Sequence, residues 1–139
     1  MILQGIAAML YAAYNNHDLA AVELLYAPDA THQDMAQPHG RAGAPAIAAG
    51  LGKFFGWFAD AHWEPELQLR GPDGEFAIAY LLTCTLGADM GPYPARGQPI
   101  SLRGVHILRV SDGRIRRSED YWDAETFKRQ LNSIHMPEE

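Results

Sequence analysis

The chain has 139 residues, of which 47% are hydrophobic, which is enough for the core of one domain and excludes a disordered protein. Its net charge is −6, and its 11 Lys and Arg residues form no dense basic patch, so we expect no nucleic-acid partner. The single Cys84 excludes an internal disulfide. With no membrane-spanning apolar run and no charged secretory start, we expect one domain over residues 1–139, cytoplasmic and without a membrane partner.

Two helices are predicted at the start of the chain. Apolar residues recur at helical spacing over residues 2–14, and the polar residues 15–17 end that pattern. Asp18 is a suitable N-cap for a second helix, because its carboxylate can accept a hydrogen bond from a free backbone N–H of the first turn. We expect this helix to end before Pro28, because proline disfavours helical backbone at the residue before it.

A third helix is expected after a short strand and a loop. Residues 30–35 predict the strand, and residues 37–41 are polar and predict the loop. Pro45 suits the first turn of a helix, since the N–H that proline lacks would be unpaired there. The expected buried side of this helix consists of Ile47, Leu51, Phe54, Phe55 and Phe58.

The remainder of the chain has strand patterns. Residues 63–69 alternate between apolar and polar side chains, and residues 76–87 predict a long, mostly buried strand. The Gly- and Pro-rich segment 89–98 is expected to be a loop at the mouth of a cavity. A hairpin follows, then a short helix over 126–131 and a loose tail over 136–139. Helices that precede strands indicate an α+β fold, with a curved antiparallel sheet packed on helices.

The hairpin has a clear turn but an ambiguous register. Asp112-Gly113 is a strong signal for a two-residue turn. On the first strand, alternation places six residues on one face of the sheet: Ile100, Leu102, Gly104, His106, Leu108 and Val110. In a regular ladder His106 lies opposite Glu119, whereas a one-residue bulge or a three-residue turn would pair it with Ser118 or Asp120. Spacing alone leaves this choice open.

Several segments together resemble the SnoaL-like polyketide cyclases, which have the nuclear-transport-factor-like fold. The resemblance is carried by residues 26–30, 40–41, 104–116, 120–123 and 129–131. The segment from His106 to Asp120 is the most specific of these. The chain departs from the family at Asn132, where a glycine is usual. The resemblance implies a cone-shaped, curved antiparallel sheet wrapped around helices.

The resemblance also implies a function. Cyclases of this family close a ring of a polyketide methyl ester by intramolecular aldol condensation, without metal or cofactor. Their catalytic Asp falls on Asp120 and their assisting His on His106, which implies that the two share a pocket and that the hairpin has a shifted register. By analogy we expect a homodimer or homotetramer, formed through an apolar outer sheet face with Ala79, Leu81, Val105 and Ile107.

Further side chains are candidates for contact with a small-molecule polyketide substrate. They are Tyr14, His32, Asp34, Phe54, Trp57, Phe58, Trp63, Leu102 and Trp122. His32 and Asp34 share a strand face, so they could be a second His/Asp pair or a hydrated strand edge.

Each candidate also has a purely structural interpretation, and the activity has alternatives. The aromatic side chains and His106 could be core residues, and Asp120 could be paired with Arg103 or Arg117. A hydroxylase, an epoxide hydrolase that uses Asp120 with Arg103, and a non-catalytic binding module remain open.

Overall fold

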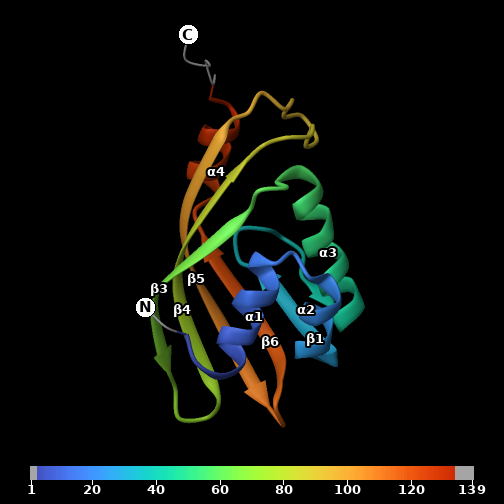
Figure 1. Ribbon diagram of the computed structural model, residues 1–139, viewed down its shortest axis with the longest axis vertical. Coiled ribbons are helices and arrows are strands. Elements are labelled where there is room, and N and C mark those ends of the chain that lie inside the picture. The colour runs from blue at the N-terminus through green and yellow to red at the C-terminus, as the bar shows by residue number, and fades with distance from the viewer. Residues whose placement is uncertain (1–2, 134–139) are drawn as a thin grey trace.

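In a computed structural model, residues 3–133 form four helices and one six-stranded sheet (Figure 1). The helices are α1 (Gly5–Asn15), α2 (Leu19–Leu25), α3 (Ala44–Trp57) and α4 (Ala124–Leu131). The strands are β1 (Tyr26–Asp34), β2 (Arg41–Ala42), β3 (His62–Arg70), β4 (Glu75–Thr85), β5 (Pro99–Ser111) and β6 (Arg114–Trp122). This confirms the predicted α+β class. The predicted tail at 136–139 lies outside the described residues.

The helix boundaries follow the expected local chemistry. The Asp18 carboxylate accepts a hydrogen bond from the Ala21 N–H at 3.1 Å and caps α2, as predicted. Proline stands in the first turn of α3, also as predicted. Asp123 caps α4 in the same way, through a hydrogen bond from the Thr126 N–H. These caps fix where the helices begin. Within residues 3–133, no helix is long and apolar enough to cross a membrane.

The sheet has the order β2-β1-β6-β5-β4-β3 and is mixed. All neighbouring pairs are antiparallel except β1 and β6, which run parallel. The prediction of an antiparallel sheet is therefore corrected for this one pair. In Figure 1, α1, α2 and α3 lie on one side of the bent sheet, and α4 lies beside β5 near the upper end of the sheet. The sequence does not predict the short β2, which begins at Arg41, the last residue of the polar loop predicted over 37–41.

The β5–β6 hairpin contains the bulge that the spacing left open. Asp112 and Gly113 form the turn with φ angles of 55° and 74°, which are the positive values that a type I′ turn requires. Val110 pairs with Ile115, but Arg109 pairs with Arg117, so Arg116 is an additional residue on β6. Beyond this bulge His106 lies opposite Asp120. The shifted register implied by the family resemblance is thus confirmed.

The two faces of the sheet differ in polarity and burial. On β5, the face that contains Ile100, Leu102, His106 and Leu108 is buried against the helices. The opposite face has Val105 at 38% exposure and its neighbour on β6, Tyr121, at 44%. The outer face is therefore partly apolar, and the homodimer or homotetramer stays a prediction.

Candidate active site

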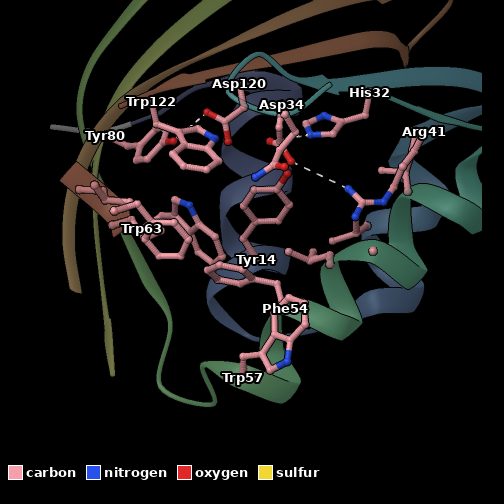
Figure 2. Close-up of a pocket in the computed structure, with 18 of the residues that line it drawn as sticks. Tyr14, His32, Asp34, Arg41, Phe54, Trp57, Trp63, Tyr80, Asp120 and Trp122 are labelled. Carbon is pink, nitrogen blue, oxygen red and sulfur yellow. Dashed lines mark hydrogen bonds and ion pairs between the residues drawn. The ribbon is translucent and has the colours of Figure 1, made fainter. Parts of the chain in front are cut away.

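A cavity of about 510 Å³ opens between the inner face of the sheet and α3 (Figure 2). One end has polar side chains: His32, Asp34, Arg41, Tyr80 and Asp120. The other end has the aromatic side chains of Phe54, Trp57 and Trp63, with Tyr14 and Trp122 between the ends and Leu102 also in the wall. All predicted substrate contacts except Phe58 therefore lie in one pocket wall. A volume of this size suits a ligand of drug size.

Phe58 is a core residue and not part of the pocket wall. Its side chain has no exposed surface, and its ring packs against those of Phe54 and Phe127 at centroid distances of 4.8 and 6.1 Å. Phe58 follows the last residue of α3, Trp57, where the chain turns away from the cavity toward β3. Helical periodicity groups Phe58 with Phe54, and it does not separate the cavity-facing ring from the ring beneath it.

Asp120 lies near the end of β6 and is held by a tyrosine from β4. The Tyr80 hydroxyl donates a hydrogen bond to Oδ1 of Asp120 at 2.7 Å. Tyr80 on β4 pairs with Gly104 on the neighbouring strand β5. A Cβ atom at Gly104 would collide with the phenol oxygen of Tyr80. The absence of a side chain at Gly104 therefore leaves the space in which the Tyr80 hydroxyl reaches Asp120.

The pKa of Asp120 is raised to about 7. Burial is the main cause, and the nearby charge of Asp34 acts in the same direction, while the hydrogen bond from Tyr80 and the charge of His32 partly oppose them. Neither arginine proposed as a structural partner contacts the Asp120 carboxylate, because Arg103 binds Glu66 and Arg117 approaches Glu119. The ion-pair interpretation of Asp120 is therefore wrong, and so is the Asp120–Arg103 pair considered for an epoxide hydrolase.

Asp34 lies beside Asp120, because the two residues are direct partners in the parallel β1–β6 pair. Oδ1 of Asp34 is 3.2 Å from Nε2 of His32, and Oδ2 is 3.9 Å from Nη1 of Arg41. Burial would raise the pKa of Asp34, but the hydrogen bond and charge of His32, with Arg41 and Trp122, outweigh burial and lower it. The pocket thus holds one carboxylate that is ionised and one whose pKa lies near neutrality, a pattern typical of acid–base sites.

A chain of hydrogen bonds supports His32 from behind. Nδ1 of His32 is 2.6 Å from Oγ of Ser118, which is 2.7 Å from the Tyr26 hydroxyl. These contacts join Tyr26 to Ser118 and Ser118 to Nδ1 of His32, and the Nε2–H of His32 donates to Asp34. Ser118 and Tyr26 are buried. This network fixes the ring that orients Asp34, so the predicted second His/Asp pair is present as a contact.

His106 lies opposite Asp120 in the ladder but is not in the pocket wall. It is 2% exposed and packs among the rings of Tyr11, Tyr14 and His32, at centroid distances of 6.0 to 6.2 Å. Among the described residues, its Nε2 atom has no hydrogen-bond partner. Burial and the nearby His32 lower the pKa of His106 to about 3, so the ring is neutral. Within residues 3–133, no hydrogen bond or ion pair joins His106 to the Asp120 carboxylate, and the assisting role implied for His106 stays a prediction.

The polar residues of the pocket wall that the sequence did not predict as catalytic residues or substrate contacts are Gln37, His39, Arg41 and Tyr80. The sequence predicts a buried strand over residues 76–87 and gives Tyr80 no role beyond that strand. The pairing of a tyrosine with a glycine on the neighbouring strand could have indicated it, but only once the β4–β5 register was known. Arg41 was used only as part of a family motif. Over residues 3–133, no cluster of three or more His, Cys, Asp or Glu side chains could hold a metal ion.

Comparisons with known proteins agree with this architecture. The model of the family described as SnoaL-like polyketide cyclase matches residues 4–131. A candidate polyketide cyclase from Xanthomonas campestris is 22% identical, with a TM-score of 0.85 and coverage of 91% of this chain and 94% of that one. IdmH, a candidate polyketide cyclase from Streptomyces antibioticus, is 24% identical, with a TM-score of 0.78 and coverage of 92% and 96%.

A third similar structure has a different description. AclR, a candidate hydroxylase from Streptomyces galilaeus, is 19% identical to this chain, with a TM-score of 0.79 and coverage of 94% and 95%. Because the three structures are all under 25% identical, the likeness establishes the fold alone. No curated protein matches the sequence.

Proposed function

Since the chain belongs to the SnoaL-like polyketide cyclase family, we propose that it closes a ring in a polyketide intermediate by intramolecular aldol condensation, with Asp120 as acid and base. The family implies a small-molecule substrate. The observation that carries the proposal is the position of Asp120, which lies in the wall of a large cavity with its carboxyl fixed by Tyr80 and its pKa near 7.

The reaction begins when the ionised Asp120 removes a proton from a carbon that lies between two carbonyl groups. The electrons of that C–H bond form an enolate, which attacks a carbonyl carbon elsewhere in the same molecule. The new C–C bond leaves an alkoxide, and protonated Asp120 returns its proton to that oxygen. The product is an isomer of the substrate, so atoms and electrons balance without a second reactant.

The surroundings of Asp120 support both of its roles. A pKa near 7 means that the charged and neutral forms are both populated at neutral pH, which suits a group that must accept and then return a proton. The hydrogen bond from Tyr80 orients the carboxyl toward one position in the cavity. Asp120 thus meets the requirements of geometry and of proton affinity together.

The shape of the cavity supplies the rest of the proposed catalysis. A flexible polyketide can fold in many ways, and only a few of them bring the enolate carbon near the carbonyl. Aromatic walls formed by Phe54, Trp57 and Trp63 would restrict the bound chain to few conformations. Orientation of this kind can supply roughly 7–11 kcal/mol, compared with the 10²–10⁴-fold typical of acid–base catalysis.

The test compares products of the wild type, Asp120→Asn and Asp112→Asn with a panel of poly-β-ketone esters and acids. Asp112 is an exposed turn carboxylate, so its variant is a matched control for the loss of one acid. We expect the wild type and Asp112→Asn to form a cyclised isomer that Asp120→Asn does not form. A product heavier by one oxygen, or by one water, would replace this proposal with hydroxylation or hydrolysis.

A further inference from the structure

The polar end of the cavity contains one cation whose hydrogen-bond donors are mostly unused. Arg41 extends from β2 into the pocket wall, and its side chain is 43% exposed. Its ionic neighbour within the described residues is Asp34, at 3.9 Å, which is too long for a hydrogen bond. Among residues 3–133, the guanidinium donates no hydrogen bond within the protein. A planar group with five N–H donors is therefore available to a ligand.

The position of the guanidinium is built into α3. A Cβ atom at Gly50 would collide with Nε and Cζ of Arg41, so the guanidinium lies directly against the backbone of the helix. Gly50 itself lines the cavity. Glycine destabilises the interior of a helix relative to alanine. The cost is offset here by a fixed seat for Arg41, which holds the side chain at the cavity and keeps it from extending freely into solvent.

The remainder of the cavity determines what kind of molecule would reach Arg41. The opposite end is aromatic, with Phe54, Trp57 and Trp63, and suits flat or unsaturated carbon skeletons (Figure 2). A carboxylate matches the forked donors of a guanidinium in pairs, whereas an ester presents neutral oxygens and cannot make two charge-assisted bonds. The two ends together thus favour an unsaturated body that ends in an acid.

We propose that Arg41, seated on Gly50, is a carboxylate-binding subsite, and that the ligand of this pocket is a free polyketide acid, not an ester. The inference rests on the proposed function in one respect, since it takes this cavity as the substrate site. Asp34 has a second role in this arrangement. It faces the same guanidinium from β1, and α3 backs the guanidinium at Gly50, so both restrain Arg41 while its remaining N–H groups can bind the ligand.

The test is a binding experiment with two compounds that differ only in charge, 2-naphthoic acid and methyl 2-naphthoate. Quenching of the tryptophans that line the cavity reports binding, and calorimetry gives the dissociation constants. We expect the wild type to bind the acid about tenfold more tightly than the ester, as one charge-assisted contact would produce. Arg41→Met should remove this preference and leave the affinity for the ester within about twofold.

Two further variants separate the effect of the Gly50 contact from the effect of the positive charge of Arg41. Gly50→Ala keeps the charge but fills the seat, so the preference for the acid should decrease while the helix keeps or gains stability. Arg114→Met makes the same chemical change at the exposed hairpin turn and should preserve the preference. Equal wild-type affinities for the two compounds, an absence of saturable acid binding, or an unchanged preference in Arg41→Met would overturn the proposal.

This result is independent of the proposed chemistry, because the assay requires no turnover. A protein that binds the acid selectively but forms no cyclised isomer would contradict the aldol reaction and leave the Arg41 subsite standing. A protein that cyclises esters and acids equally well, with no dependence on Arg41, would contradict the Arg41 subsite and leave the aldol reaction standing. The two failures are therefore distinguishable in the same set of variants.

Discussion

The concave (inner) face of the sheet, which the helices cover, and its convex (outer) face both contain ionisable side chains. The two faces differ in how far solvent reaches these side chains. On the convex face, Arg103 binds Glu66 at 3.0 Å, and its side chain is 71% exposed. On the concave face, Asp120 forms no ion pair within residues 3–133 and is held by the neutral hydroxyl of Tyr80. Water solvates the first pair whether or not its members meet. Asp120 depends on its protein neighbours for the same stabilisation, because the helices cover that face.

This difference explains why proton affinities depart from their ordinary values on one face. Burial raises the pKa of Asp120 to about 7 and lowers that of His106 to about 3. Both changes favour the neutral form, as desolvation requires. The two residues pair across β5 and β6, yet only Asp120 opens on the cavity. Burial therefore prepares one of them for proton transfer and keeps the other neutral within the core.

Asp120→Asn should have the largest effect on this contrast. We expect kcat to fall by about 10²–10⁴-fold, since the variant cannot accept a proton. The stability of the folded protein should instead increase at high pH. A carboxyl whose pKa is higher in the folded state than in the unfolded chain stabilises the protein below the unfolded pKa, and that contribution is lost as pH rises through about 7. Asp120→Asn should therefore unfold at a higher temperature than the wild type above about pH 8, with the gap closing toward pH 4.

Thermal unfolding followed by circular dichroism across pH measures this gap, and steady-state rates give kcat. The asparagine can still accept the hydrogen bond from Tyr80, so the local packing is preserved. If the wild type were instead more stable than the variant at high pH, Asp120 would be a stabilised carboxylate, and the contrast between the two faces would be wrong.

Tyr80→Phe should have the next largest effect, on the pH profile. The hydrogen bond from Tyr80 lowers the pKa of Asp120, so its removal raises that pKa further. Because Asp120 must be ionised to act as a base, the midpoint of the rise in kcat with pH should move upward, by about one pH unit. Gly104→Ala should move it in the same direction, since the added methyl displaces the hydroxyl without deleting it, although the methyl also presses on the Tyr121 carbonyl oxygen of β6.

The pH dependence of kcat in the three proteins is the measurement. A midpoint that stays in place in both variants would mean that Tyr80 only fills space. A midpoint that moves in Tyr80→Phe but not in Gly104→Ala would mean that the Tyr80 hydroxyl can reach Asp120 from another rotamer, and that Gly104 does not control its position.

The contrast between the faces also indicates what the sequence could predict. Alternation on β5 identified the buried face that contains His106, and the Asp112-Gly113 turn identified the hairpin, because both signals are local. The parallel contact of Asp34 with Asp120 could not be predicted in this way. Its strands are separated by most of the chain, and no turn links their register. The exclusion of His106 from the cavity has the same cause, since it depends on rings contributed by α1 and β1.

Asp34→Asn should have a smaller effect than Tyr80→Phe, with the opposite sign. The charge of Asp34 raises the pKa of Asp120, so the neutral amide should lower it and move the midpoint of the pH profile downward. The introduced amide keeps an oxygen that can accept the hydrogen bond from His32, so the network to Ser118 is retained. Increasing salt should weaken the difference only slightly, because the two carboxylates are mostly shielded from ions. An upward shift would contradict the assignment of Asp34 as the ionised neighbour.

Glu66→Gln should have the smallest effect, and it tests the convex side of the comparison. It removes the charge partner of Arg103, whose exposed guanidinium is then stabilised by water. We expect no measurable change in kcat, in the midpoint of its pH profile or in the unfolding temperature. The removal of one charge at Asp34 and at Glu66 is chemically the same change. If both moved the midpoint equally, the pKa of Asp120 would respond to the net charge of the protein and not to its position in the cavity wall.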